Sequence, residues 1–217
     1  MADPSSRAGT RYSNPELLAW VDALHHPLDA ALSRAFDAPA QGLPAIQVGR
    51  AEGALLGLLL RLQGARKVVE LGTLAGFSAL YIARALGPEG HLWTVEMNPL
   101  HARVARENIQ LAGLSERVTV CEGAALERLP ELEPHGPFDA VFLDADKGNY
   151  DRYGQWAARN LRPGGLLLGD NAYLFGDLLG DAPEASKMRR FHQELSNDFN
   201  AVCVPTPDGL VVAVKKS

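Results

Sequence analysis

Cysteine is scarce in this sequence of 217 residues: only Cys121 and Cys203 are present, and no Cys-x-x-Cys pair occurs. Neither a disulfide framework nor a cysteine zinc site is indicated, and a reducing cytoplasm fits this usage. Positive charge is also in short supply, because 21 lysines and arginines face 26 acidic residues and leave a net charge of -5. That balance argues against a nucleic-acid partner bound through a broad basic surface.

Long apolar segments are missing as well. The most apolar stretch, residues 54–60, is cut by Arg61 and is far too short to cross a bilayer. Residues 1–10 lack the apolar core that a signal peptide needs. We therefore expect a soluble, cytoplasmic protein without a membrane partner.

What the sequence does contain is a regular alternation of predicted strands and helices. Its length suits one sizeable core, and we expect a loose N-terminus at residues 1–13 followed by a single domain at residues 14–217. Two helices come first, over 14–36 with a break at Pro27 and over about 48–62. The alternation that follows predicts a mostly parallel, doubly wound α/β sheet.

The last two predicted strands differ from the others in how they are connected. Only residues 205–209 join them, a turn short enough for an antiparallel hairpin but not for a parallel crossover. The three tryptophans, Trp20, Trp93 and Trp156, are expected to be packing residues. The predicted strands are 67–71, 91–95, 118–121, 138–143, 166–169, 201–204 and 210–214.

Polar residues follow two of these strands directly. Asp144-Ala-Asp146-Lys147 ends one apolar segment, and Asp170-Asn171 ends the next. Residues just past the carboxyl ends of parallel strands line the ligand crevice. If the two strands are neighbours, two carboxylates and one amide oxygen converge beside a lysine, a ligand set that suits Mg²⁺, Mn²⁺ or Ca²⁺. Taken singly, Asp170-Asn171 also fits a simple turn and Lys147 a solvated surface residue.

A glycine-bearing segment, residues 70–76, follows the first strand and opens a helix. Its Gly-x-x-x-Gly spacing is not the dinucleotide fingerprint, which makes an NAD-dependent dehydrogenase a distant alternative. The acidic Glu70 just before the loop suits a cationic ligand. Glu96, at the end of the second strand, is placed to accept hydrogen bonds from both hydroxyls of a ribose.

The ordered segments 70–78, 96, 122–125, 144–147 and 170–171 together resemble the cation-dependent S-adenosylmethionine O-methyltransferases of the caffeoyl-CoA and catechol type. The resemblance covers about residues 45 to 217. It implies a Rossmann-like class I methyltransferase fold with a seven-stranded sheet, and a homodimer. It also implies methylation of one hydroxyl of a vicinal dihydroxy aromatic small molecule.

The same resemblance implies a role for individual residues. Lys147 is expected to be the catalytic base, with Asp144 beside it in the catalytic centre. Metal binding is assigned to Asp144, Asp170 and Asn171. Cofactor binding is assigned to Val48, Glu70, Gly72, Thr73, Ser78, Glu96, Ala125, Asp144 and Asp146.

The expected chemistry explains why these residue types are needed. Methyl transfer from a sulfonium to a phenol oxygen is an in-line displacement, and the oxygen must be close to phenolate. A divalent cation chelated by both oxygens lowers their pKa and selects which one faces the methyl group. Lys147 can take the proton once the charge of the metal favours the neutral amine. Two alternatives stay open: a metal-independent methyltransferase in which Asp170-Asn171 is structural, and a non-catalytic protein that binds the cofactor.

Residues 172–176 depart from the family pattern. The plant enzymes that act on coenzyme A thioesters carry an asparagine that meets the substrate where this chain has Phe175. Phe175 cannot make that hydrogen bond. An apolar wall of Tyr173, Leu174 and Phe175 is expected to favour a smaller aromatic ring held by packing.

Overall fold

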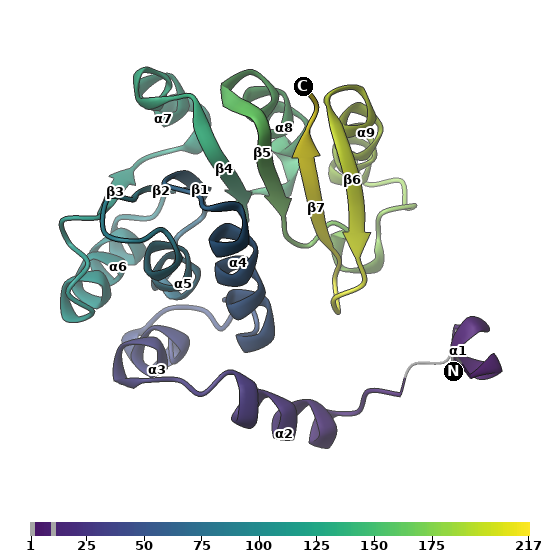
Figure 1. Cartoon of the computed structure of the whole chain (residues 1–217), viewed down its shortest axis with the longest axis horizontal. Coiled ribbons are helices and arrows are strands. Elements are labelled where there is room, and N and C mark those ends of the chain that lie inside the picture. The colour runs from purple at the N-terminus through teal and green to yellow at the C-terminus, as the bar shows by residue number, and fades with distance from the viewer. Residues whose placement is uncertain (1–2, 10–11) are drawn as a thin grey trace.

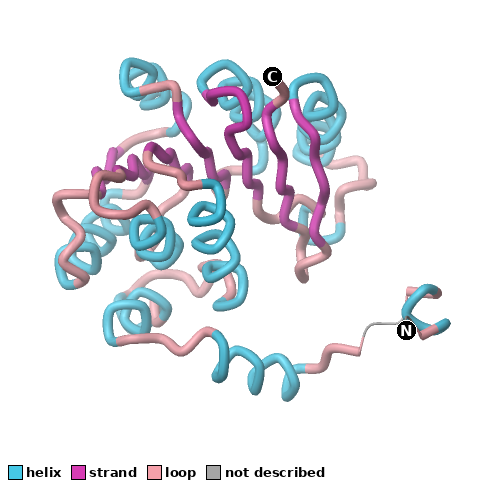
Figure 2. Tube along the Cα trace, viewed as in Figure 1, coloured by secondary structure: helices cyan, strands magenta, loops and turns pink. Residues whose placement is uncertain are grey.

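The computed structural model describes residues 3–9 and 12–217, which form a seven-stranded sheet with helices on both faces (Figures 1 and 2). The strand order is β3-β2-β1-β4-β5-β7-β6. Neighbours from β3 to β5 are parallel, and β7 is antiparallel to both β5 and β6. The strands are β1 (Lys67–Leu71), β2 (His91–Glu96), β3 (Val118–Glu122), β4 (Phe138–Leu143), β5 (Leu161–Gly169), β6 (Phe199–Val204) and β7 (Leu210–Lys215).

Two layers of helices enclose the parallel strands. Because strand side chains alternate between faces, Val68 packs in the cluster formed with α3 to α6, and Val69 packs in the cluster formed with α7 to α9. The central strands are therefore buried on both sides. The helices are α1 (Pro4–Arg7), α2 (Pro15–His25), α3 (Ala30–Phe36), α4 (Arg50–Gln63), α5 (Phe77–Ala85), α6 (Pro99–Leu111), α7 (Ala125–Leu132), α8 (Tyr150–Asn160) and α9 (Pro183–Asp198).

The fold predicted from the sequence is confirmed, and strand β5 departs most from its predicted bounds. Strand β5 begins at Leu161 rather than at residue 166, because a register shift between Phe138 and Ala140 lets the Pro163 segment continue the strand. Helix α7 runs through Pro130 to Leu132. Its last turn forms because Leu132 is buried in the core, and this packing outweighs the backbone bond that a proline loses.

Helices α1 and α2 stand apart from the sheet, whereas α3 packs against the helical layer beneath it (Figure 1). The predicted break at Pro27 separates α2 from α3, and the side chain of Asn14 accepts the Leu17 amide hydrogen to begin α2. The expectation that Trp20 packs in the core is wrong, because this side chain is 65% exposed. The helical periodicity of this segment is real, but no part of the described chain covers its apolar face, since none of the residues Pro15–His25 is buried.

The predicted boundary between a loose N-terminus at 1–13 and a domain at 14–217 stays a prediction. Residues 1–2 and 10–11 of that segment lie outside the described residues. Within the described ranges 3–9 and 12–217, no helix has the length and apolar character needed to cross a membrane.

Candidate active site

The site lies at the carboxyl ends of β1, β4 and β5, where polar residues leave three neighbouring strands. Strands β4 and β5 pair in parallel with Leu143 opposite Gly169. The amide of Asp144 donates to Leu71 O at 2.8 Å, and that of Asp170 donates to Leu143 O at 2.9 Å. The backbone ladder therefore continues one residue past each strand. It fixes where the two carboxylates start.

The loop after β1 is held closely against β4. Gly72 has a φ of 96°, and a Cβ at this position would lie 2.0 Å from the carbonyl oxygen of Asp144. Only glycine combines that conformation with such a close approach. This contact joins the predicted cofactor loop to the predicted catalytic segment at the point where the strand order reverses, which is where open α/β sheets bind ligands.

Glu96 organises the same loop from the end of β2. Its Oε2 accepts hydrogen bonds from the amides of Thr73 at 3.2 Å and Leu74 at 2.9 Å, and its Oε1 accepts from the amide of Asn98 at 2.8 Å. The Nδ1 atom of His101 lies 3.5 Å from Oε1. Each carboxylate oxygen can accept more than one bond, so these contacts leave capacity for a ribose. The cofactor role of Glu96 stays a prediction.

Glu70 lies beneath the loop rather than on its surface. The residue is 0% exposed, and its Oε2 accepts a hydrogen bond from Thr94 Oγ1 at 2.6 Å. Burial raises the pKa of Glu70 to about 8, although the hydroxyls of Ser78 and Thr94 oppose the rise. A carboxyl with this pKa is mostly neutral at pH 7, so its charge is a weaker reason for a cationic ligand than the sequence suggested.

The other residues predicted to bind the cofactor differ in their burial and in their hydrogen-bond partners. Val48 is buried in the core before α4, so only its backbone is available to a ligand. Ala125 begins α7 just after β3 and is half-buried. Asp146 is exposed and accepts hydrogen bonds from the Tyr153 hydroxyl and from Asn149 Nδ2. These assignments also stay predictions.

Lys147 is held against Asp144 by a buried tyrosine. Its Nζ lies 3.1 Å from Asp144 Oδ1 and donates to the Tyr150 hydroxyl at 3.0 Å. That hydroxyl in turn contacts the carbonyl oxygens of Leu143 at 2.9 Å and Asp170 at 2.7 Å. Tyr150 therefore connects the ends of β4 and β5 to the lysine. Burial raises its pKa well above the usual value, which keeps the hydroxyl protonated.

Two acidic residues that sequence reasoning missed face Asp170. Glu52 comes from the first turn of α4 and Asp208 from the turn between β6 and β7. Oxygen atoms of Glu52, Asp170 and Asp208 all lie within 4.8 Å of one another. The only sequence signal for Glu52 was a carboxylate at a helix N-terminus, which the helix dipole alone explains, and Asp208 read as a turn residue.

The electrostatics of this acidic group favour the binding of a cation. Burial, the charge of Asp144 and the charge of Glu52 raise the pKa of Asp170 to about 9. Burial also raises the pKa of Asp144, which Lys147 opposes, and that of Glu52. The Oε1 atom of Glu52 is buried without a hydrogen-bond partner in the described chain. Clustered carboxylates with an unused buried oxygen fit a divalent ion with oxygen ligands.

The loop after β5 only partly matches the predicted apolar wall. Leu174 is buried in the core with α8 and α9, so it cannot face a ligand, and its part in the wall is wrong. Phe175 is 71% exposed. Both residues adopt left-handed backbone conformations, with φ values of 50° and 53°. This tight turn directs one apolar side chain inward and presents the next to solvent.

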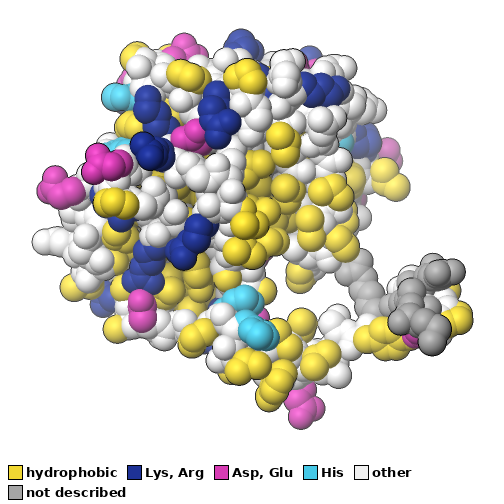
Figure 3. Space-filling model, in the orientation of Figure 1, with side chains coloured by type: hydrophobic (Ala, Val, Ile, Leu, Met, Phe, Trp, Pro, Cys, Tyr) yellow, Lys and Arg dark blue, Asp and Glu magenta, His cyan; other side chains and the backbone are white. Residues whose placement is uncertain are grey.

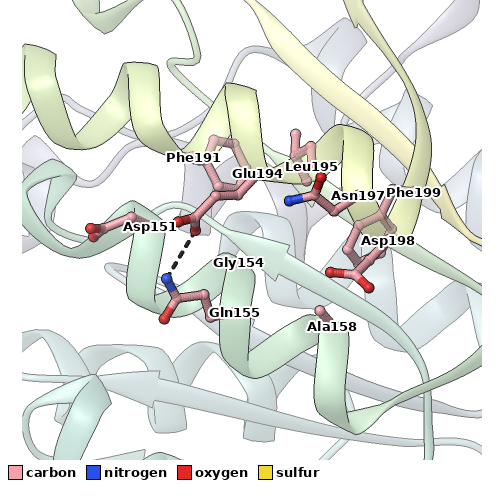
Figure 4. Close-up of a pocket in the computed structure, with 10 residues that line it drawn as sticks. All are labelled: Asp151, Gly154, Gln155, Ala158, Phe191, Glu194, Leu195, Asn197, Asp198 and Phe199. Carbon is pink, nitrogen blue, oxygen red and sulfur yellow. Dashed lines mark hydrogen bonds between the residues drawn. The ribbon is translucent and has the colours of Figure 1, made fainter.

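A separate cavity of about 240 Å³ lies between α8 and α9 (Figure 4). Gly154 and Phe191 line it, together with a hydrogen bond from Gln155 Nε2 to Glu194 Oε2 at 2.9 Å. None of the predicted site residues contributes to its lining. We therefore keep the candidate site at the strand ends.

The strand order, with its parallel strands and C-terminal antiparallel hairpin, is that of the Rossmann-like methyltransferase fold expected from the sequence. Residues 23–216 match the sequence profile of a family described as O-methyltransferase, and the chain belongs to that family. The predicted family and fold are thus confirmed.

Individual relatives agree with this membership. The chain is 40% identical to a catechol O-methyltransferase of Niastella koreensis over 207 residues, which is 90% of this chain and 94% of that protein. It is 44% identical to a catechol O-methyltransferase of Mycobacterium tuberculosis over 172 residues, 79% of this chain and 78% of that one. A solved O-methyltransferase from Streptomyces achromogenes in complex with S-adenosylmethionine superposes with a TM-score of 0.89 at 34% identity, covering 93% of this chain and 96% of that one. The protein is an S-adenosylmethionine-dependent O-methyltransferase.

Proposed function

We propose that this enzyme methylates one hydroxyl of a vicinal dihydroxy aromatic small molecule and that it needs a divalent metal ion, Mg²⁺ or alternatively Mn²⁺ or Ca²⁺. Two observations support this proposal. Lys147 lies beside Asp144 at the end of β4. Asp170 at the end of β5 forms an acidic group with Glu52 and Asp208. Two relatives named catechol O-methyltransferase support the substrate class. Asp144, Asp170 and Asn171 would hold the metal, and when bound it would acidify and orient the two hydroxyls.

The residues of the chain divide the remaining work. Lys147, in its neutral form, would take the proton of the reacting hydroxyl on Nζ. S-adenosylmethionine, when bound, would supply the methyl group to that oxygen and leave as the neutral thioether. Asp144 holds Nζ at 3.1 Å, and the Tyr150 hydroxyl supports it from the buried side. The loop fixed by Gly72 and Glu96 would hold the cofactor, and alignment of its methyl group with that oxygen would remove much of the entropic barrier.

The loop after β5 supports a small acceptor. Phe175 is largely exposed in the loop that follows Asp170 and Asn171 and offers an apolar face. It has no polar atom with which to hold a coenzyme A thioester. A single aromatic ring packed against Phe175 and chelated by its two oxygens satisfies both features of the site.

We also infer a homodimer. The exposed apolar residues of α2 include Leu17, Leu18 and Trp20, and hydrophobic side chains gather over β6 and β7 (Figure 3). Apolar patches of this kind mark protein contacts, and a second copy would cover an α2 that its own chain leaves exposed. Sedimentation should give twice the monomer mass. The cytoplasmic location expected from the sequence stays a prediction.

Transfer of a labelled methyl group tests the proposed reaction. The enzyme is offered catechols, single phenols and caffeoyl esters, with Mg²⁺, with EDTA, and with EDTA followed by excess Mg²⁺. We expect methyl transfer to acceptors that carry a vicinal diol and none to single phenols. This turnover should be lost with EDTA and restored by Mg²⁺. Turnover that survives EDTA would favour the metal-independent alternative. Tight cofactor binding without transfer to any acceptor would favour a binding protein.

A further inference from the structure

The turn between β6 and β7, residues 205–209, is fastened to the loop that carries Asn171. The amide of Ala172 donates to Gly209 O at 2.8 Å, and that of Tyr173 donates to Asp208 O at 2.8 Å. Gly209 has a φ of 82°, and a Cβ there would lie 2.8 Å from the Tyr173 ring. The hairpin turn is thus held in place by backbone bonds that do not depend on the Asp208 side chain.

The Asp208 side chain makes one further contact, and it is directed at Asn171. The Nδ2 atom of Asn171 donates a hydrogen bond to Asp208 Oδ2. The Asn171 backbone is also constrained, with a φ of 53° and its amide donating to Asp170 Oδ1 at 2.6 Å. Backbone and side chain of Asn171 are therefore both fixed by neighbouring carboxylates.

This contact matters because only one end of an asparagine amide can bind a cation. The carbonyl oxygen can serve as a ligand, whereas the NH₂ group is a donor with nothing to offer a metal. The two orientations of the amide have nearly the same shape, so packing alone selects poorly between them. A carboxylate that accepts from Nδ2 selects the orientation in which the oxygen is free for the ion.

We propose that Asp208 is a positioning residue, which orients the Asn171 amide so that its oxygen is available to the divalent ion. This inference rests on the proposed metal requirement. It adds a residue from the C-terminal hairpin to a site predicted only from the ends of β4 and β5. This role acts through the Asn171 amide and is separate from any direct coordination by the Asp208 carboxylate.

Manganese titration followed by the electron paramagnetic resonance signal of free Mn²⁺ tests the proposal without measuring activity. The full-length enzyme is titrated in the presence of S-adenosylmethionine. We expect Asp208→Ala to weaken Mn²⁺ binding by about 10–100-fold, the range found when an outer partner of a metal ligand is lost. Asp208→Asn keeps an acceptor oxygen for Asn171 Nδ2 and should bind Mn²⁺ within about threefold of the unchanged protein.

The rescue by asparagine is the decisive comparison. If Asp208→Asn binds as weakly as Asp208→Ala, the charge of Asp208 is what matters and the positioning role is overturned. In an Asn171→Ala background, Asp208→Ala should cause no further loss, because no amide remains to orient. Additive losses in that double-mutant cycle would also overturn the proposal.

Controls separate this inference from folding and from the proposed function. Asp181→Ala removes an exposed acid of the same region and should leave Mn²⁺ affinity unchanged. Cofactor affinity and melting temperature should be unchanged in Asp208→Ala. If this variant does not fold, Asp208→Ser is used in its place. Absence of Mn²⁺ binding by the unchanged protein would contradict the metal requirement itself, whereas normal binding by Asp208→Ala would contradict only the role of Asp208.

Discussion

Two groups of carboxylates lie at the carboxyl ends of the strands, and they differ in the hydrogen-bond donors and charges that surround them. On the cofactor side, Glu96 accepts three backbone amides and Glu70 accepts a threonine hydroxyl. On the acceptor side, Glu52, Asp170 and Asp208 approach within 4.8 Å of one another. Glu96 is satisfied by backbone donors, whereas Glu70 keeps its Oε1 atom buried without a partner in the described chain. The acceptor side instead brings several acids together.

The difference shows how one crevice can treat two ligands differently. Carboxylates already bonded to the protein form a rigid frame that is ready before the cofactor arrives, which lowers the cost of ordering on binding. Carboxylates that face one another repel, and a divalent ion removes that repulsion. Changes on the acceptor side should therefore affect metal-dependent chemistry, and changes on the cofactor side should affect cofactor affinity.

The largest effect is expected from Asp170→Ala. Loss of this ligand should lower metal-dependent turnover by at least about 10³-fold, because the contribution of the metal to the transition state amounts to several kcal/mol. Cofactor affinity should stay nearly unchanged, because Asp170 lies beyond β5 on the acceptor side. Turnover with Mg²⁺ checks the expected loss of activity, and calorimetric titration of S-adenosylmethionine checks the expected cofactor affinity. An equal loss of cofactor affinity would break the division between the two groups.

Lys147→Met should have the next largest effect. If Lys147 removes the phenol proton, kcat should fall by roughly 10²–10⁴-fold, with little change in metal or cofactor affinity. Lys147→Arg should not restore the rate, because a guanidinium stays protonated at any working pH. Recovery with arginine would mean that Lys147 contributes only positive charge. Near-normal turnover of Lys147→Met would mean that no side-chain base is needed here.

Glu96→Ala tests the cofactor side. S-adenosylmethionine binding should weaken by about 1–3 kcal/mol, because a charged acceptor of hydrogen bonds is lost. Glu96→Gln keeps one acceptor oxygen and should lose less, which separates the charge from the support given to the Thr73 and Leu74 amides. The dissociation constants come from calorimetry without metal. Unchanged affinity in Glu96→Ala would leave this residue with only a structural role.

The smallest effect concerns the stability of the cofactor-free chain and Glu70. Its folded pKa of about 8 exceeds the usual 4.5, so the folded chain keeps a proton that the unfolded chain releases between those values. Stability should therefore fall as pH rises through this window. Glu70→Gln should abolish about 1–2 kcal/mol of that fall between pH 6 and 8. Denaturant unfolding at both pH values measures the free energy of unfolding, and the exposed Glu16→Gln serves as control. The same change in unfolding free energy between the two pH values for Glu70→Gln and the unchanged chain would contradict the buried proton.

Much of the fold was predictable because its signals are local. The strands at 67–71 and 138–143 occur with the predicted bounds, since apolar runs and Gly or Pro stops act over a few residues. The condition set for the site, that the strands before Asp144 and Asp170 be neighbours, is met because β4 and β5 pair in parallel. Parallel strands joined by helices leave few alternatives for the order of the sheet.

The sequence by itself determined the family, the sheet and the motifs at the strand ends, because each depends on short-range pattern. Only the tertiary structure decided which distant side chains join them. Glu52 reaches the site because α4 packs across the sheet. Asp208 reaches it because the hairpin turn forms backbone hydrogen bonds with the loop of Asn171. Tyr150 reaches it because a buried hydroxyl needs partners, which two strand ends supply. Trp20 stays exposed for the converse reason: periodicity predicts an apolar helix face, but it cannot say whether the covering surface belongs to the same chain.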